Sequence, residues 1–186
     1  MCYTKLNKVT VVKCALIILG IDPGYAIVGY GVIEYRNNHF RVLDFGAITT
    51  QAHTDFNDRL LHIYSGITNL VEIYKPEAMA IEKLFFNTNQ KTVIDVAQAR
   101  GVTILPAVKA GIPIYEYTPL QVKNTVTGFG RAEKKQVQEM IRRTLNLKEV
   151  PKPDDTADAL GLAITHGRTA RSLSFVANSA ERELKL

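Results

Sequence analysis

The sequence predicts an α/β protein with a mixed five-stranded sheet and helices on both faces of that sheet. Three observations predict this class. Three strand-like segments come first, within residues 15–49, and the second and third are joined through the turn-rich Arg36-Asn37-Asn38. Helical and strand-like segments then alternate along the chain. Hairpins pair strands antiparallel and helical crossovers pair them parallel, so one sheet is expected to contain both kinds of pairing.

Each strand is predicted from a short apolar run that ends in a turn or in a polar residue. Residues 15–21 (ALIILGI) are apolar throughout, which is typical of a strand buried on both faces, and Asp22-Pro23-Gly24 ends the run. Residues 78–82 (AMAIE) form a shorter run that ends in a carboxylate. The other strands are expected at residues 29–35, 41–49 and 112–117.

Helices are predicted where apolar residues recur every three or four positions. In residues 55–74 this spacing joins Leu60, Ile67 and Val71, and Pro76 ends the pattern. The other helices are expected at residues 90–109, 134–147 and 155–167. A chain of 186 residues is expected to form one domain. We place that domain at residues 15–168, with an N-terminal extension at 1–14 and a loose C-terminal tail at 169–186.

The composition excludes several classes of protein. A hydrophobic fraction of 46% and a charged fraction of 22% exclude a wholly disordered chain, a collagen-like chain and a coiled coil. No apolar run approaches the ~18 residues of a membrane span. Lys13 interrupts the apolar run at 9–21, which therefore does not form an export signal. With two cysteines only, Cys2 and Cys14, the chain has no disulfide framework, and a cytoplasmic location is expected.

The positive charge is concentrated in one segment. The net charge of the chain is +5, and residues 123–152 alone carry eight basic and three acidic residues, which also gives +5. Such a patch is a candidate surface for phosphate groups, and a solvated helix face is the alternative. The basic residues are Lys123, Arg131, Lys134, Lys135, Arg142, Arg143, Lys148 and Lys152.

Four carboxylates stand at the ends of predicted buried elements. Asp22 ends the most apolar strand, and Glu82 ends another. Asp155 and Asp158 lie three residues apart at the start of the last helix, so they share one side of it. The run after Asp158, ALGLAI, is apolar on nearly every face. An ionised group in such surroundings is costly unless it is paired or bound to a metal.

Each of these acids also has a simpler interpretation. Asp155 and Asp158 are compatible with capping of a helix, and Asp22 with an ordinary turn before Pro-Gly. An ion pair with a nearby lysine would explain Glu82. Taken together, acids from two buried strand ends and an apolar helix have few polar partners except each other, and clustered like charges attract a cation. Oxygen ligands without His or Cys at metal spacing favour Mg²⁺ or Mn²⁺.

Four segments, in order, resemble the RuvC-type crossover junction endodeoxyribonucleases, the bacterial Holliday-junction resolvases. They are IILGIDPG at 17–24, AIEKLFF at 80–86, QVKNTVTGFGRAEKKQVQ at 121–138 and DDTADALGLAITH at 154–166. The resemblance covers residues 15–168 and implies a ribonuclease-H-like fold. It also implies cleavage of four-way DNA junctions in homologous recombination and DNA repair.

The resemblance implies a role for seven residues. By similarity, Asp22, Glu82, Asp155 and Asp158 match the four acidic metal ligands, although some members carry His at the position of Asp155. Phe85 matches an aromatic residue that contacts bases at the junction. The residues matching the family's DNA-contacting lysines near the scissile phosphate are Lys123 and Lys134. Asp154 has no counterpart to which a role is assigned.

The implied reaction is hydrolysis of a phosphodiester by two divalent ions. Two Mg²⁺ ions per site, for which Mn²⁺ would substitute, would clamp the scissile phosphate about 4 Å apart and leave a 5′-phosphate and a 3′-hydroxyl. The family is dimeric, and a two-fold homodimer would cut two symmetry-related strands. We expect the helix at 90–109 to form the interface. The junction-binding and branch-migration motor proteins of the resolvasome are further expected partners, and no membrane is expected.

Three other functions compete with this one. A transposase-like or RNA-processing nuclease would share the fold and the basic segment. An actin-like sugar kinase would share the first hairpin, but such enzymes usually need two like domains and a longer chain. A protein that binds junctions without cutting them would not need four acids. Nicking of four-way junctions, linear duplex and an RNA hybrid would distinguish these functions.

Overall fold

The computed structural model describes residues 15–83 and 90–183 and has a single five-stranded sheet with the strand order β3-β2-β1-β4-β5. Strand β1 pairs antiparallel with β2 and parallel with β4, so the predicted mixed sheet is confirmed. The elements are β1 (Leu16–Asp22), β2 (Ile27–Arg36), β3 (His39–Thr49), α1 (Phe56–Tyr74), β4 (Ala78–Glu82), α2 (Gln90–Lys109), β5 (Ile114–Tyr117), α3 (Pro119–Thr127), α4 (Lys134–Thr144) and α5 (Asp154–Glu183).

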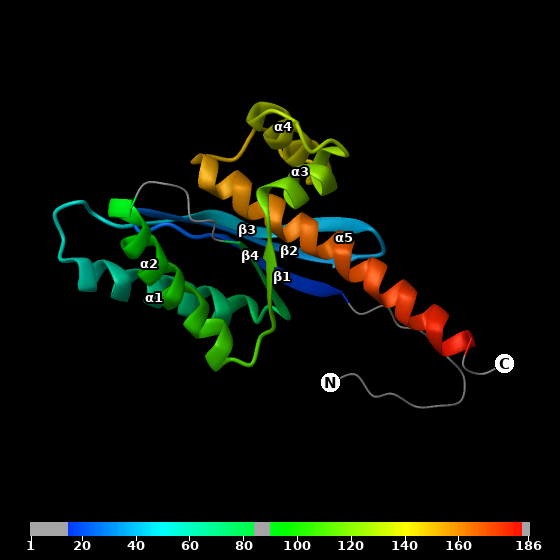
Figure 1. The fold of residues 1–186 in the computed structure, drawn as a ribbon, viewed down its shortest axis with the longest axis horizontal. Helices are drawn as coiled ribbons and strands as arrows, with labels where there is room; N and C mark the ends of the chain where they lie inside the picture. Colours follow the sequence, from blue (N-terminus) through cyan, green and yellow to red (C-terminus); the bar gives the residue numbers. More distant parts are fainter. Residues whose placement is uncertain (1–14, 84–89, 184–186) are drawn as a thin grey trace.

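Helices cover both faces of the sheet, as the sequence predicts. Figure 1 shows α1 and α2 on one side and α3, α4 and α5 on the other. Each side has its own core of buried side chains, because successive residues of a strand point to opposite faces. In β1, Ile18 packs on the α5 side, whereas Leu19 and Ile21 pack on the α1 side. None of the described helices is long and apolar enough to cross a membrane.

Helix α5 packs directly on the backbone of β1 and β2. A Cβ atom on Gly20 would collide with the carbonyl oxygen of Ala159, and one on Gly29 with the carbonyl oxygen of Asp155. Only glycine permits such a close approach of helix to strand. Because Gly29 pairs with Asp22 across the two strands, this contact places the start of α5 beside the end of β1.

Two helices differ from the prediction. Helix α3 was not predicted: it has nine residues and buries only Val126, so it has little apolar periodicity. A capping box at Thr118, with Gln121 three residues on and Pro119 first in the helix, is the signal that marks its start.

Helix α5 is also longer than predicted. It continues to Glu183, so the residues expected to form a loose tail from 169 onward are helical. The loose tail is not observed over 169–183, because a helix can continue past the end of its apolar pattern where no residue breaks it. No proline follows Pro153 and no glycine follows Gly167, so nothing in the sequence breaks the helix there.

His166 is a buried residue of α5 with a structural role. Its Nδ1 lies 2.8 Å from the hydroxyl oxygen of Tyr117, and its ring lies 4.2 Å from that of Tyr115. The side chain therefore joins α5 to β5. Burial lowers the pKa of His166 to about 4, so the imidazole is neutral in the folded protein at neutral pH.

We expect this buried histidine to make the protein less stable in mild acid. The unfolded chain takes up the proton near pH 6.5 and the folded protein only near pH 4, so stability falls as pH drops through this window. The loss should be about 1–2 kcal/mol, allowing for partial screening by solvent. Chemical unfolding of the parent and of His166→Gln at pH 7 and pH 4.5 measures it. Equal losses in both proteins would contradict the assignment.

Candidate active site

Two carboxylates meet at one edge of the sheet because two parallel strands end there. Ile21 of β1 pairs with Ile81 of β4, and the next residues are Asp22 and Glu82. Both follow the alternation of their strands, so they share the face that α5 covers. The two carboxyl groups lie within hydrogen-bonding reach of each other.

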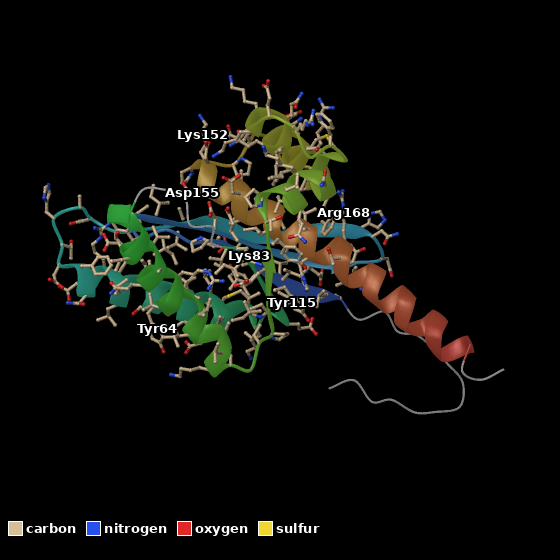
Figure 2. All side chains as sticks on the ribbon, in the orientation of Figure 1. Tyr64, Lys83, Tyr115, Lys152, Asp155 and Arg168 are labelled. Carbon is tan, nitrogen blue, oxygen red and sulfur yellow. The ribbon has the colours of Figure 1, made fainter. Side chains whose placement is uncertain are left out.

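Helix α5 brings two further carboxylates to the same edge. Asp155 lies in its first turn, above the paired Asp22 and Gly29. Figure 2 shows Asp155 near the start of α5 and Arg168 farther along the same helix. Asp158 follows Asp155 by one turn. It is the fifth residue of α5, beyond the capping positions, so the capping interpretation does not hold for Asp158.

Burial and neighbouring charges disturb the ionisation of Asp22, Glu82 and Asp158. Burial, together with the charges of Glu82, Asp158 and Asp155, raises the pKa of Asp22 to about 8. Burial and the charge of Asp158 also raise the pKa of Glu82. For Asp158, burial raises the pKa although Lys134 opposes the shift. These upward shifts show that the crowded carboxylates bind positive charge favourably.

One positive group already lies against the cluster. Lys134, the first residue of α4, places its Nζ 3.2 Å from Oδ2 of Asp158 and 3.1 Å from Oδ2 of Asp154. This ion pair lowers the pKa of Asp154, which is exposed at the start of α5. The sequence did not predict either contact.

A cavity of about 250 Å³ opens beside the acids and the lysine. Its walls combine apolar side chains from α3, α4 and α5 with both lysines that the sequence singled out. An apolar floor with charged groups around it suits a ligand that has an apolar body and an anionic group. The lining residues are Glu82, Pro119, Val122, Lys123, Lys134, Val137, Asp158 and Leu162.

Comparison with known proteins agrees with this arrangement. The family model described as "Crossover junction endodeoxyribonuclease RuvC" matches residues 18–166. The chain belongs to the RuvC family. A RuvC of Ruminiclostridium cellulolyticum is 55% identical over 163 residues, which cover 88% of this chain and 98% of that protein. A RuvC of Clostridioides difficile is 54% identical over 170 residues, which cover 91% of this chain and 96% of that protein.

Solved structures support the same family. A Thermus thermophilus RuvC in complex with a Holliday junction substrate is 35% identical, with a TM-score of 0.80 over 84% of this chain and 96% of that one. A yeast mitochondrial Holliday junction resolvase shares the fold at 14% identity, with a TM-score of 0.67 over 93% of this chain and 86% of that one. Membership in the RuvC family confirms the predicted resemblance and displaces the sugar-kinase and transposase-like alternatives.

The structure brings together six of the seven site residues predicted for this RuvC-family chain. The four acids and Lys134 form one cluster, and Lys123 lines the adjoining cavity. Phe85 lies outside the described residues. Sequence reasoning missed the contact of Lys134 with Asp154. The only signal for it is the spacing of Asp154 and Asp158, four residues apart on one side of a helix.

Tyr25, which directly follows Asp22-Pro23-Gly24, packs against α1. Its ring lies 4.6 Å from the guanidinium carbon of Arg59 and 6.4 Å from the ring of Phe56. Arg59 also donates a hydrogen bond to the Tyr25 carbonyl oxygen at 3.2 Å. These contacts favour a packing role for Tyr25.

The donor set of this RuvC-family site fits a divalent cation. All four candidate ligands offer carboxylate oxygens, which Mg²⁺ and Mn²⁺ prefer, and their mutual repulsion is relieved when a cation binds. In the observed side-chain conformations, no group of three Asp, Glu, His or Cys residues within 15–83 and 90–183 is arranged so that it could hold a metal ion. Rotation of these side chains, and release of Asp158 by Lys134, must therefore accompany cation binding.

Proposed function

We propose that this chain is a junction-resolving endonuclease that cuts four-way DNA by paired symmetric nicks in the cytoplasm. Such cuts separate joined duplexes in homologous recombination and DNA repair. The observation that carries the proposal is the convergence of Asp22, Glu82, Asp155 and Asp158 beside a cavity lined by two lysines. The names of the RuvC relatives, and the junction bound to the Thermus thermophilus protein, support the choice of substrate.

We assign the binding of two Mg²⁺ ions per site to the four acids, with Mn²⁺ as a substitute. When bound, these ions supply a hydroxide nucleophile and stabilise the leaving 3′ oxygen, so that a 5′-phosphate remains. Asp22 and Glu82 hold their part of the site on the rigid sheet, whereas Asp155 and Asp158 hold theirs on α5. Lys123 and Lys134 offer positive charge to the scissile phosphate from the wall of the cavity.

The experiment that tests this function compares nicking of several nucleic acids. Synthetic four-way junctions, linear duplex of the same sequence and an RNA–DNA hybrid are incubated with the protein and Mg²⁺. We expect paired nicks in the junction alone, with ligatable 5′-phosphate ends. Binding of the junction without nicking in either Mg²⁺ or Mn²⁺ would favour the alternative of a non-cutting junction-binding protein.

We expect junction binding to depend steeply on salt through Lys123, which lines the cavity, and through two further basic residues of the 123–152 segment. Lys123, Arg131 and Lys135 form no ion pair with the acids of the described residues. Their combined replacement by alanine should lower the log–log slope of affinity against salt by about 2–3, since each phosphate contact contributes about 0.9. Gel shifts in Ca²⁺ at several salt concentrations measure the slope.

A control uses two basic residues that share one acidic partner. Arg142 and Arg143 both bind Glu139, at 2.8 and 2.7 Å. Their replacement by alanine should change the slope less than replacement of the unpaired set. A larger change of the slope on replacing Arg142 and Arg143 would place the DNA at the C-terminal end of α4.

We propose that α2 forms the interface of a homodimer. Three of its apolar side chains, Ile94, Leu105 and Val108, are between 48% and 65% exposed and lie on one side of the helix. Gly101 lies on the same side, and a Cβ atom added there would meet nothing within 4 Å. An exposed apolar stripe of this kind suits a self-complementary contact about a two-fold axis.

Charges placed on this stripe should separate the dimer. Leu105→Lys combined with Val108→Lys should shift the protein to a monomer in light scattering, because burying two ammonium groups at an interface is costly. The monomer should nick one strand of a junction without coupling to the second nick. Leu61→Lys, at an exposed apolar position on α1, is the control. A double variant that stays dimeric would refute the assignment of α2.

Two further roles rest on the resemblance to the family alone. We propose that Phe85 contacts bases that have lost their partners at the crossover, where stacking is worth about 1–3 kcal/mol per base. We also propose that branch-migration motor proteins bind the enzyme when it acts on a junction.

A further inference from the structure

Lys134 makes a contact for which the proposed chemistry has no evident use. Its Nζ lies 3.2 Å from Oδ2 of Asp158, a proposed cation ligand, but also 3.1 Å from Oδ2 of Asp154. An ammonium group has three N–H donors, so it can donate to both carboxylates at once. Asp154 and Asp158 are four residues apart on α5 and therefore face Lys134 from the same side of the helix.

The two carboxylates that share Lys134 have different surroundings. Asp158 belongs to the acid cluster, because its charge acts on both Asp22 and Glu82. The charge of Asp154 acts on Asp158, but its side chain is more exposed, 59% against 35%, and it does not line the cavity as Asp158 does. The ammonium group of Lys134 therefore lies at the boundary, between a carboxylate inside the cluster and one outside it.

Cation binding disturbs only one of the two contacts. A divalent cation that takes Asp158 competes for the carboxylate that Lys134 contacts, and like charges repel at such short range. Lys134 then leaves Asp158. Its second partner, Asp154, lies outside the cluster and remains available. Lys134 therefore stays at the wall of the cavity.

We propose that Asp154 is a positioning residue that retains the Lys134 ammonium group at the edge of the active site when a divalent cation takes Asp158. The inference rests on the proposed function, since it assigns Asp158 to the cation. Asp154 does two things in this arrangement. It makes the release of Asp158 by Lys134 easier, and it keeps Lys134 on the side of the cavity where the phosphate is expected.

The test measures Mn²⁺ affinity of the full chain without DNA, by electron paramagnetic resonance, in the parent, Asp154→Asn, Lys134→Met and the double variant. Asp154→Asn should weaken Mn²⁺ binding about two- to fivefold, which is the strength of a partly exposed ion pair. The reason is that Lys134 then has Asp158 as its remaining acidic contact and competes with Mn²⁺ for it. Lys134→Met should tighten binding by removing a competitor. When Lys134 is already methionine, Asp154→Asn should change the free energy of Mn²⁺ binding by less than half as much as it does in the parent protein.

Three controls separate positioning from a general loss of charge or of structure. Lys135→Met removes an exposed lysine next to Lys134 on α4 and should leave Mn²⁺ affinity within twofold of the parent. Asp154→Glu should restore the affinity, because it keeps the negative charge. In cleavage assays, Asp154→Asn should lower kcat while the affinity for the junction in Ca²⁺ stays the same.

The outcomes distinguish this inference from the proposed function. An equal effect of Asp154→Asn with and without Lys134 would show a direct effect of its charge and overturn the inference alone. So would an unchanged Mn²⁺ affinity of Asp154→Asn. A parent protein that binds no Mn²⁺ and cuts no junction would overturn the proposed function, and the inference with it.

Discussion

Asp158→Asn should lower junction cleavage at least about 100-fold while the protein stays folded. The substitution keeps the size of the side chain and removes a charge that the proposed two-metal site requires. In the absence of metal, relief of repulsion with Asp22 and Glu82 offsets the lost ion pair with Lys134, so the free energy of unfolding should change by less than about 1 kcal/mol. Thermal melting in EDTA and cleavage in Mg²⁺ measure the two effects on one preparation.

Binding of the junction should survive the same substitution. One negative charge near the phosphate is gone, so affinity measured in Ca²⁺ at low concentration should be equal or higher. Glu72→Gln removes a charge from an exposed position on α1, on the other side of the sheet, and should leave cleavage within twofold. A folded Asp158→Asn protein that cuts at near the parental rate would remove this residue from the active site.

Gly20→Ala should lower both the stability and the activity of the protein, because Gly20 is buried in the contact between β1 and α5. Its new Cβ atom would collide with the carbonyl oxygen of Ala159 and crowd the side chain of Ala163, so α5 must move away from β1. Overpacking of this kind costs about 3 kcal/mol, which corresponds to a fall in Tm of about 6–12 °C. Cleavage should also fall more than about tenfold below the Tm, because Asp158 adjoins Ala159 and moves with the helix.

Gly66→Ala provides the matched control. There the nearest atom is the end of the flexible Ile48 side chain, which can turn aside, and the gain in helix propensity within α1 compensates part of the cost. The free energy of unfolding should therefore change by less than about 1 kcal/mol, and cleavage should not change. A Gly20→Ala protein as stable as the parent would show that α5 has more freedom over the sheet than the contacts indicate.

The sheet and its acids could be predicted because their pattern is local. The apolar runs that end at Asp22 and Glu82 mark strands by composition alone, and parallel neighbours bring both carboxylates to one edge. The pairing of β1 with β4 was also accessible, since helical crossovers lead to parallel strands.

What could not be predicted depends on packing between elements. The contact of Lys134 with Asp154 and Asp158 requires that α4 and α5 pack together, and the sequence of neither segment alone predicts that packing. Helix α3 was missed because a short helix with one buried residue has little apolar pattern, and its capping signal was not used. The extension of α5 to Glu183 could not be predicted from apolar periodicity, because a helix continues beyond its apolar pattern where no residue breaks it.

The close contact of α5 with the glycines of β1 and β2 also determines when the enzyme becomes active during its synthesis. The acids come from β1, β4 and α5, so the cluster spans almost the whole described chain, and α5 emerges last from the ribosome. A nascent chain that has formed β1 and β4 carries Asp22 and Glu82 but lacks the two carboxylates of α5. A partial product that lacks α5 cannot therefore assemble the proposed four-acid site, and we expect cutting of DNA only after this helix has docked.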